Sequence, residues 1–254
     1  MTKVVRVRVS PAAPKTKTRI VNTMRVFFNP SKFVESLCFS RGTALSLQLG
    51  HRLSEDLDFC LFEDKLDSPT LDFLIQEISK NHSVRLMTPA SKITQAKING
   101  IDLLAYSRDY LIDGVKVTFF ARNDVPYAHF SQLETIHYDS ITFSLMTSSA
   151  IFKMKAWLIQ KCIKSRDLFD LMQLLIINSG TIESLFIASR DAEVAIYSEE
   201  FLKDALTGLI PIDSDDEGFD SIGLNISLEE VYTFFRRAID EYEIGRAKAL
   251  KSRK

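Results

Sequence analysis

The sequence predicts an α+β fold, with a mixed or antiparallel sheet in residues 1–135 and a bundle of helices in residues 136–254. In the first part, apolar and polar residues alternate over several short runs, a period typical of half-buried strands. From Ser148 onward, apolar residues recur every three or four positions, which is the period of an amphipathic helix. We therefore expect two domains that divide near residue 135.

The first part is predicted to mix short strands with short helices. The predicted strands cover 5–9, 57–62, 83–86, 93–98, 101–106 and 115–120, and the predicted helices cover 18–28, 42–49 and 71–79. Asn99-Gly100 and Asp113-Gly114 suit type I′ hairpins, because these residue types tolerate positive φ. An antiparallel meander is therefore expected after the first strand–helix unit.

The second part is predicted to be helical throughout. Its predicted helices cover 149–164, 167–177, 181–189, 199–209 and 228–250. Ser227 and Glu230 form the S-x-x-E pattern of a capping box immediately before the last of them. The acidic stretch 213–217 is expected to be a loop between helices.

The charge of the chain is balanced overall but uneven along its length. A net charge of −1, with 26% charged and 46% hydrophobic residues, is ordinary for a globular protein and excludes disorder or a fibre. Residues 1–34 contain no acidic side chain, and residues 246–254 are also basic. These ends are compatible with contacts to an RNA backbone, and equally with simple solvation.

The cysteine spacing and the lengths of the apolar runs indicate the cellular compartment. Cys38, Cys60 and Cys162 are not closely spaced, which argues against a disulfide framework and against a zinc site. Neither a signal peptide nor an apolar run long enough to cross a bilayer is present in the sequence. We therefore expect a cytoplasmic protein with no membrane partner.

The segment 41–60, RGTALSLQLGHRLSEDLDFC, contains the residues with the clearest chemical pattern. Gly42-Thr43 is expected to open a helix and to offer backbone N–H groups to a phosphate. Asp56 and Asp58 follow at the start of an apolar strand, where residues two apart share a face. Two adjacent carboxylates repel each other unless a cation lies between them, and Mg²⁺ prefers such oxygen ligands. The segment therefore predicts a Mg–NTP site.

A simpler explanation exists for these residues. An Asp-x-Asp pair is frequent by chance, and both carboxylates can be solvated at a strand end. The order of turn, helix and acidic strand is more specific than any of its parts.

The string GTALSLQLGHRLSEDLDF resembles the signature of the AbiEii/AbiGii family, which are toxin-type nucleotidyltransferases of the polymerase-β-like superfamily. Two later blocks also resemble family motifs, FKMKA at 152–156 and RDLFDL at 166–171. The resemblance covers roughly residues 33–178. It implies a polymerase-β-like nucleotidyltransferase domain followed by a helical domain that completes the active-site cleft.

The resemblance also implies roles for individual residues. Asp56 and Asp58 would hold Mg²⁺ (or Mn²⁺), and Lys153 would bind the triphosphate of an NTP. Asp170 would orient Lys153 or help to activate the acceptor. Lys155 competes with Lys153 for the phosphate, and because the two are about 200° apart on a helix, only one faces the cleft easily.

Further nucleotide-binding candidates are Gly42, Thr43, Arg41 and Arg52. Arg41 replaces the first glycine of the family motif, so it either strains the backbone or places a cation beside the phosphates. Arg52 either reaches a phosphate or is an ordinary surface arginine.

A second departure concerns the third carboxylate of many relatives, which lies on a later strand. Thr118 occupies that position here and cannot act as an anionic ligand. Asp113 is expected to face the other way, so Asp170 is the candidate to replace the missing group.

The function implied is transfer of a nucleoside monophosphate from ATP, GTP or CTP to an acceptor, with RNA such as tRNA as the expected acceptor. The family resemblance implies a toxin of a toxin–antitoxin pair in phage defence, with a cognate antitoxin as partner. Two alternatives remain open at this point. In the first, the acceptor is a protein or a small molecule; in the second, the chain is a non-catalytic module that binds a nucleotide or a partner.

Overall fold

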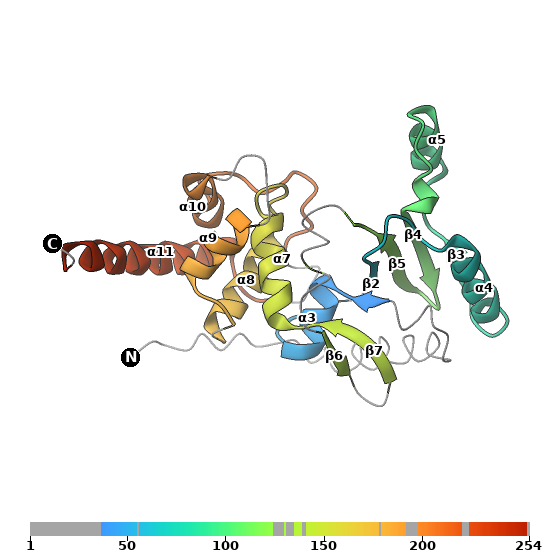
Figure 1. Cartoon of the computed structure of the whole chain (residues 1–254), viewed down its shortest axis with the longest axis horizontal. Helices are drawn as coiled ribbons and strands as arrows, with labels where there is room; N and C mark the ends of the chain where they lie inside the picture. Colours follow the sequence, from blue (N-terminus) through green and yellow to red (C-terminus); the bar gives the residue numbers. More distant parts are fainter. Residues whose placement is uncertain are drawn as a thin grey trace. The chain divides into compact units, whose positions relative to one another are not determined.

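The computed structural model of the chain describes residues 37–54, 56–123, 130, 135–138, 141–177, 179–191, 198–219 and 224–252. They form two compact units that divide after Thr147, an α+β unit and a helical unit (Figure 1). This is the predicted fold class, but the division lies after Thr147 rather than after residue 135. The predicted strand at 5–9 and helix at 18–28 lie outside the described residues.

A mixed sheet forms the centre of the α+β unit, with seven strands among the described residues. In sheet order these are β3 (Val84–Leu86), β4 (Ser107–Ile112), β5 (Val115–Ala121), β2 (Leu57–Leu61), β1 (Cys38–Phe39), β7 (Ile141–Met146) and β6 (Thr135–Tyr138). The pairs β2/β5 and β1/β7 are parallel, and the other neighbours are antiparallel. Strands β6 and β7, which the sequence did not predict, move the division of the units toward the C-terminus. Strand β2, which follows Asp56, is the central strand.

The β4–β5 hairpin confirms the predicted Asp113-Gly114 turn. Both turn residues have positive φ, 48° for Asp113 and 77° for Gly114, as a type I′ turn requires. The Asp113 carboxylate also accepts a hydrogen bond from the Ser83 backbone N–H at 2.9 Å and contacts His82 Nδ1 at 2.7 Å. These contacts connect the turn to the segment that leads into β3, so β3, β4 and β5 form the expected meander.

Two predicted strands of this region are wrong. Residues 93–98 belong to helix α5 (Ala90–Ile98), and residues 101–106 contain a short 3-10 helix (Leu103–Ala105). Helix α5 has no buried residue, and Ile98 is 73% exposed. The spacing of its isoleucines therefore does not reflect a core, and the helix propensity of its Ala, Lys and Gln residues prevails.

Helices α3 (Arg41–Leu49) and α4 (Ser68–Ser79) confirm the other two helical predictions for the described part of this unit. Helix α3 ends at Gly50, whose left-handed φ of 61° terminates the helix. Helix α4 begins three residues earlier than predicted, because the Asp67 side chain caps it by accepting from Thr70 N–H.

Alternation along the central strands places the site residues on one face of the sheet. Leu57, Phe59, Val117 and Phe119 are at most 1% exposed, and the rings of Phe59 and Phe119 stack with centroids 5.4 Å apart. Since side chains alternate along a strand, the intervening residues of β2 and β5 project from the opposite face. The predicted candidate Asp58 is one of these residues.

The helical unit comprises α7 (Ser148–Leu158), α8 (Ser165–Ile176), α9 (Ile182–Asp191), α10 (Glu199–Thr207) and α11 (Leu228–Lys251). All five correspond to predicted helices, and the capping box at Ser227 and Glu230 is present. Trp157, Phe169 and Phe235 are at most 1% exposed and form part of its core. None of the described helices is both long and apolar enough to span a membrane.

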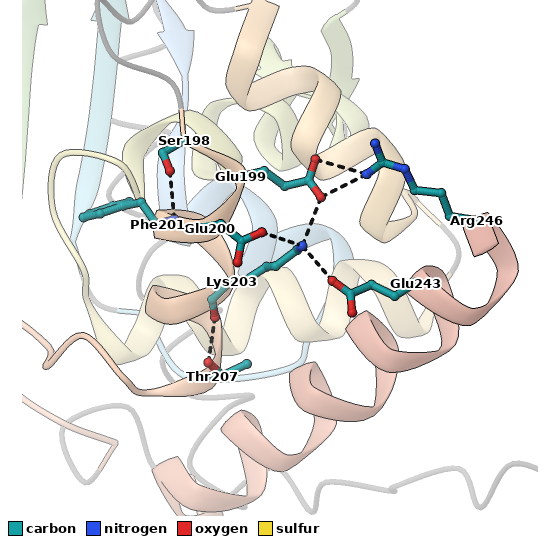
Figure 2. A network of polar contacts seen from close by, with 8 residues as sticks. All are labelled: Ser198, Glu199, Glu200, Phe201, Lys203, Thr207, Glu243 and Arg246. Atoms are coloured by element: carbon teal, nitrogen blue, oxygen red, sulfur yellow. Dashed lines mark hydrogen bonds and ion pairs between the residues drawn. The ribbon is translucent and has the colours of Figure 1, made fainter. Parts of the chain in front are cut away.

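A cluster of ion pairs joins α10 to α11, as Figure 2 shows. The Lys203 ammonium lies 2.6 Å from Glu243 on α11 and 3.1 Å from Glu199 on its own helix. Arg246 of α11 lies 3.2 Å from Glu199. This cluster fixes the first turns of α10 against the long helix.

The acidic stretch 213–217 is a loop, as predicted, and it stabilises the start of α8. Asp216 accepts hydrogen bonds from the Ser165 backbone N–H at 3.0 Å and from the Ser165 hydroxyl at 2.6 Å. Lys164 pairs with Asp213 at 3.7 Å and also contacts Asp215. These acidic groups therefore serve the fold of the helical unit.

Candidate active site

The start of α3 is tied to the strand that carries the aspartates. The buried Thr43 hydroxyl donates to the backbone carbonyl of Asp56 and contacts the Ser54 hydroxyl. The Ser40 backbone N–H donates to the carbonyl of Asp58 at 3.0 Å. The Ser40 side chain makes no capping hydrogen bond, so it leaves the first-turn N–H groups of α3 to other partners. This geometry places a helix N-terminus, which favours anions, beside two carboxylates.

Gly42 leaves room for the Arg52 guanidinium, and its backbone does not have the positive φ that favours glycine. A Cβ atom at Gly42 would collide with the Arg52 guanidinium. Arg52 is only 5% exposed and donates from Nη1 to the Leu53 carbonyl at 2.9 Å. Arg52 is therefore not the surface arginine of the simpler explanation, but a buried cation beside the turn at Gly42.

Asp56 and Asp58 share one face of the sheet, as the alternation of the strand predicted. Asp58 lies directly beside Thr118 of β5, and Asp56 pairs with Lys116, which lies two residues before Thr118. The side chains of Asp56 and Asp58 are 49% and 17% exposed, so both are accessible to a ligand.

Two cations neutralise this acidic pair at long range. Arg41 Nη1 lies 3.6 Å from Asp58 Oδ1, and Lys116 Nζ lies 3.9 Å from Asp56 Oδ2. Both distances exceed that of a good charge-assisted hydrogen bond. The contacts are therefore loose, and a ligand with higher charge can replace them.

Burial raises the pKa of Asp58 above its ordinary range. Arg41 and Lys116 lower this pKa, whereas the charges of Asp56 and Asp109 raise it. Among the described residues, the cation beside this partly buried carboxylate is Arg41, at 3.6 Å, and a bound metal ion would favour its ionised form.

Arg41 has the positive φ that the family's glycine suggested, 64°. Its guanidinium lies 4.3 Å from the centre of the Phe120 ring, within the range of a cation–π interaction. The first of the two alternatives, a strained backbone, is therefore confirmed, and the Arg41 guanidinium lies beside Asp58. Whether Arg41 contacts a phosphate stays a prediction.

The position of Thr118 agrees with its place in the motif pattern, since it lies opposite Asp58 in the parallel β2/β5 pair. Sequence reasoning missed its other neighbour. Asp109 lies opposite Thr118 in β4, and the Thr118 hydroxyl donates to Asp109 Oδ1 at 2.9 Å. The signal that was available is the Asp113-Gly114 turn, because a two-residue hairpin fixes which residues face each other.

In the helical unit, Asp170 pairs with Lys155 rather than with Lys153. Lys155 Nζ lies 2.8 Å from Asp170 Oδ2 and also contacts Asp167. The side chains of Lys155 and Asp170 are 3% and 0% exposed. The prediction that Asp170 orients Lys153 is therefore wrong, because the lysine that Asp170 contacts is Lys155. The two lysines point to different sides of α7, and it is Lys155 that faces α8.

Lys153 is half-buried, and within the described part of the chain no carboxylate pairs with it. It is thus the lysine of this motif that retains an unpaired charge among the described residues. No group of three or more His, Cys, Asp or Glu side chains that could hold a metal ion occurs among the described residues.

The model of one protein family matches residues 26–243, which is most of the chain. That family is described as the nucleotidyl transferase AbiEii toxin of type IV toxin–antitoxin systems. The match includes the segment in which the sequence motifs were found and extends beyond it on both sides. No curated protein sequence matches the chain.

Solved structures with a similar fold include two bacterial proteins. JHP933 from Helicobacter pylori is 15% identical, with 97% of this chain and 100% of that chain covered and a TM-score of 0.46. MenT4, a nucleotidyltransferase toxin from Mycobacterium tuberculosis, is 13% identical, with 88% and 84% covered and a TM-score of 0.49.

Proposed function

The chain belongs to the AbiEii nucleotidyltransferase toxin family and is a nucleotidyltransferase, and we propose that it transfers a nucleoside monophosphate from an NTP to RNA, such as tRNA. Asp56 and Asp58 are proposed to hold the divalent cation that the reaction needs. One observation carries this proposal. The two carboxylates lie on one face at the start of β2, beside the start of α3, and Thr43 connects α3 to the Asp56 backbone.

The two aspartates fit Mg²⁺ or Mn²⁺. These ions take oxygen ligands, and Mg²⁺ is commonly held by one or two carboxylates together with substrate phosphates and water. Both carboxylates are accessible, and their present cations lie 3.6 and 3.9 Å away. When bound, the ion supplies a positive charge that stabilises the phosphate oxygens during transfer.

The other residues are proposed to bind and orient the triphosphate. The first-turn N–H groups of α3, at Gly42 and Thr43, offer hydrogen bonds to a phosphate, and Arg41 and Arg52 add positive charge there. Lys153 is proposed to bind the triphosphate as a point charge. Lys155 and Asp170 are proposed to shape α7 and α8 rather than to bind the nucleotide directly.

The biological setting is proposed from the family description. The chain acts as the toxin of a toxin–antitoxin pair in phage defence and is neutralised by a cognate antitoxin. An RNA acceptor is supported by the exposed basic end of α11, where Lys248 and Lys251 face solvent.

The test is to supply each α-labelled NTP with Mg²⁺ to three mixtures, which contain total tRNA, a protein extract or no acceptor. Label is expected in tRNA and to disappear in the variant Asp58→Ala, while Asp102→Ala, an exposed residue of the same unit, retains the activity. Label in protein or in a small molecule would replace the proposed acceptor. Toxicity that survives both Asp56→Ala and Asp58→Ala would exclude the proposed metal site.

A further inference from the structure

A third carboxylate, that of Asp109, lies in the same row of the sheet as the acidic pair. Asp109 of β4 faces Thr118 of β5, and Thr118 faces Asp58 of β2. Neighbouring strands are about 5 Å apart. The row therefore extends from Asp58 across one strand to a second acidic side chain.

The position of Asp109 is fixed by its neighbours. Its backbone N–H donates to the Thr88 hydroxyl at 3.0 Å, and its carbonyl accepts from Met87 N–H at 2.7 Å. The hydroxyl of the buried Thr118 donates to the carboxylate at 2.9 Å. Both the backbone and the carboxylate of Asp109 are thus held in place.

Asp109 projects from the face of the sheet that carries the acidic pair. In β4, Arg108, Tyr110 and Ile112 are buried on the opposite face, and Asp109 is half-buried between them in sequence. Within the described residues, no lysine or arginine forms an ion pair with its carboxylate. Its negative charge also raises the pKa of Asp58, although burial of Asp58 and the charges closer to it have larger effects on that pKa. Asp109 is therefore a fixed carboxylate without a cation, close to the site.

Other carboxylates are less suited to the same role. Asp113 lies in the hairpin turn, where His82 and the Ser83 N–H occupy it. Asp170 is fully buried and paired with Lys155. Neither offers a carboxylate on the face of the sheet that carries Asp58.

We propose that Asp109 is the proton acceptor of the transfer reaction, in place of the carboxylate that Thr118 lacks; this rests on the proposed function. The oxygen of the acceptor hydroxyl forms a bond to the α-phosphorus. The bond from that phosphorus to the pyrophosphate oxygen breaks, and pyrophosphate leaves with the electron pair. The hydroxyl proton passes to the Asp109 carboxylate. Thr118 positions that carboxylate through its hydrogen bond.

The first test is Asp109→Asn, which keeps the size of the side chain and an oxygen that accepts from Thr118. General base catalysis contributes about 100-fold or more, so transfer of label from NTP to total tRNA is expected to fall by about that factor. The rise in melting temperature on adding Mg–ATP is expected to remain. Asp102→Asn, an exposed carboxylate of the same unit without a capping hydrogen bond, is the matched control and retains full transfer.

The second test is rescue. Adding Thr118→Asp to Asp109→Asn returns a carboxylate to the row, one strand nearer to Asp58, and is expected to recover at least about tenfold of the lost rate. A purely structural role of Asp109 would not be rescued from another strand.

Three results would overturn the inference. These are normal transfer by Asp109→Asn, loss of its Mg–ATP stabilisation together with transfer, or a loss of transfer that Thr118→Asp does not recover. Asp58→Ala separates this inference from the proposed function. If Asp58→Ala retains transfer, the proposed function fails. If Asp58→Ala is inactive while Asp109→Asn is active, only the role of Asp109 fails.

Discussion

The two units treat their charged residues in opposite ways. At the sheet, the side chains of Asp56 and Asp58 are 49% and 17% exposed, and the described cations that pair with them lie 3.9 and 3.6 Å away. In the helical unit, Lys155 and Asp170 are 3% and 0% exposed and only 2.8 Å apart. One cluster is open and loosely paired, whereas the other is closed and tightly paired.

This difference separates groups that bind a ligand from groups that hold the fold. An ion that replaces a loose, partly exposed pair gains two carboxylates at little cost to the protein, because exposed pairs contribute only about 0–1 kcal/mol to stability. Breaking a buried pair leaves an uncompensated charge. We therefore expect substitutions at the sheet to change activity and substitutions at the buried pair to change stability.

The largest effect on stability is expected for Lys155→Met. It removes the ammonium group that pairs with the buried Asp170, and removing one partner of a buried pair costs about 3–5 kcal/mol. Urea denaturation followed by circular dichroism measures this change. Lys153→Met is the matched control on the same helix and is expected to change the free energy of unfolding by less than about 1 kcal/mol. Equal stability of the two variants would contradict the contrast between the clusters.

The next effect is on catalysis. Lys153→Ala is expected to lower transfer by about 100-fold, which corresponds to about 2.7 kcal/mol of transition-state stabilisation, and to leave the melting temperature unchanged. The reason is the loss of a point charge at the triphosphate. Steady-state rates against NTP concentration check this, with Lys161→Ala, an exposed lysine after the same helix, as control. Full activity of Lys153→Ala would remove it from the proposed site.

A smaller effect is expected for the cluster between α10 and α11 (Figure 2). Lys203 is 14% exposed and contacts Glu199, Glu200 and Glu243. Burial alone would lower the pKa of Lys203, but the glutamate hydrogen bonds raise it above its ordinary value. Lys203→Met is expected to cost about 1–2 kcal/mol, less than the buried pair, because the pairs are partly solvated. The difference from wild type should shrink in 1 M salt, at a Debye length of about 3 Å; a difference independent of salt would contradict this origin.

The sequence predicted those elements that bury a regular apolar face. The strand after Asp56, helix α3 and helix α11 with its capping box follow from local patterns. Helix α5 was not predicted, because it has no buried residue and its sequence pattern therefore carries no information about a core.

The candidate site was predictable as far as local geometry extends. Asp56 and Asp58 share a face because a strand alternates, and the Asp113-Gly114 turn alone implies that Asp109 faces Thr118. The parallel pairing that brings Thr118 beside Asp58 joins strands far apart in sequence, and no local pattern contains it. In the same way, helix geometry requires Lys153 and Lys155 to diverge, but the packing of α8 decides which of them is buried.

The smallest effect on stability is expected for Arg41→Gly. Arg41 is a cation on an open site, and its backbone has a φ of 64°. Glycine would relieve about 1 kcal/mol of backbone strain, and it would lose an ion pair that contributes about 0–1 kcal/mol, because the arginine side chain is 41% exposed. The free energy of unfolding should therefore change by less than about 1 kcal/mol.

The affinity for a metal ion should change more clearly than stability. Since Arg41 competes with a cation for Asp58, Arg41→Gly is expected to tighten Mn²⁺ binding about fivefold, or about 1 kcal/mol, as measured by calorimetry without nucleotide. Arg41→Ala removes the same charge but retains the left-handed strain, so it should bind Mn²⁺ equally well and be about 1 kcal/mol less stable than the glycine variant. Weaker Mn²⁺ binding by both variants would show that Arg41 supports the acidic pair instead of competing for it, and the loose pairing at the sheet would then not mark an exchangeable cation.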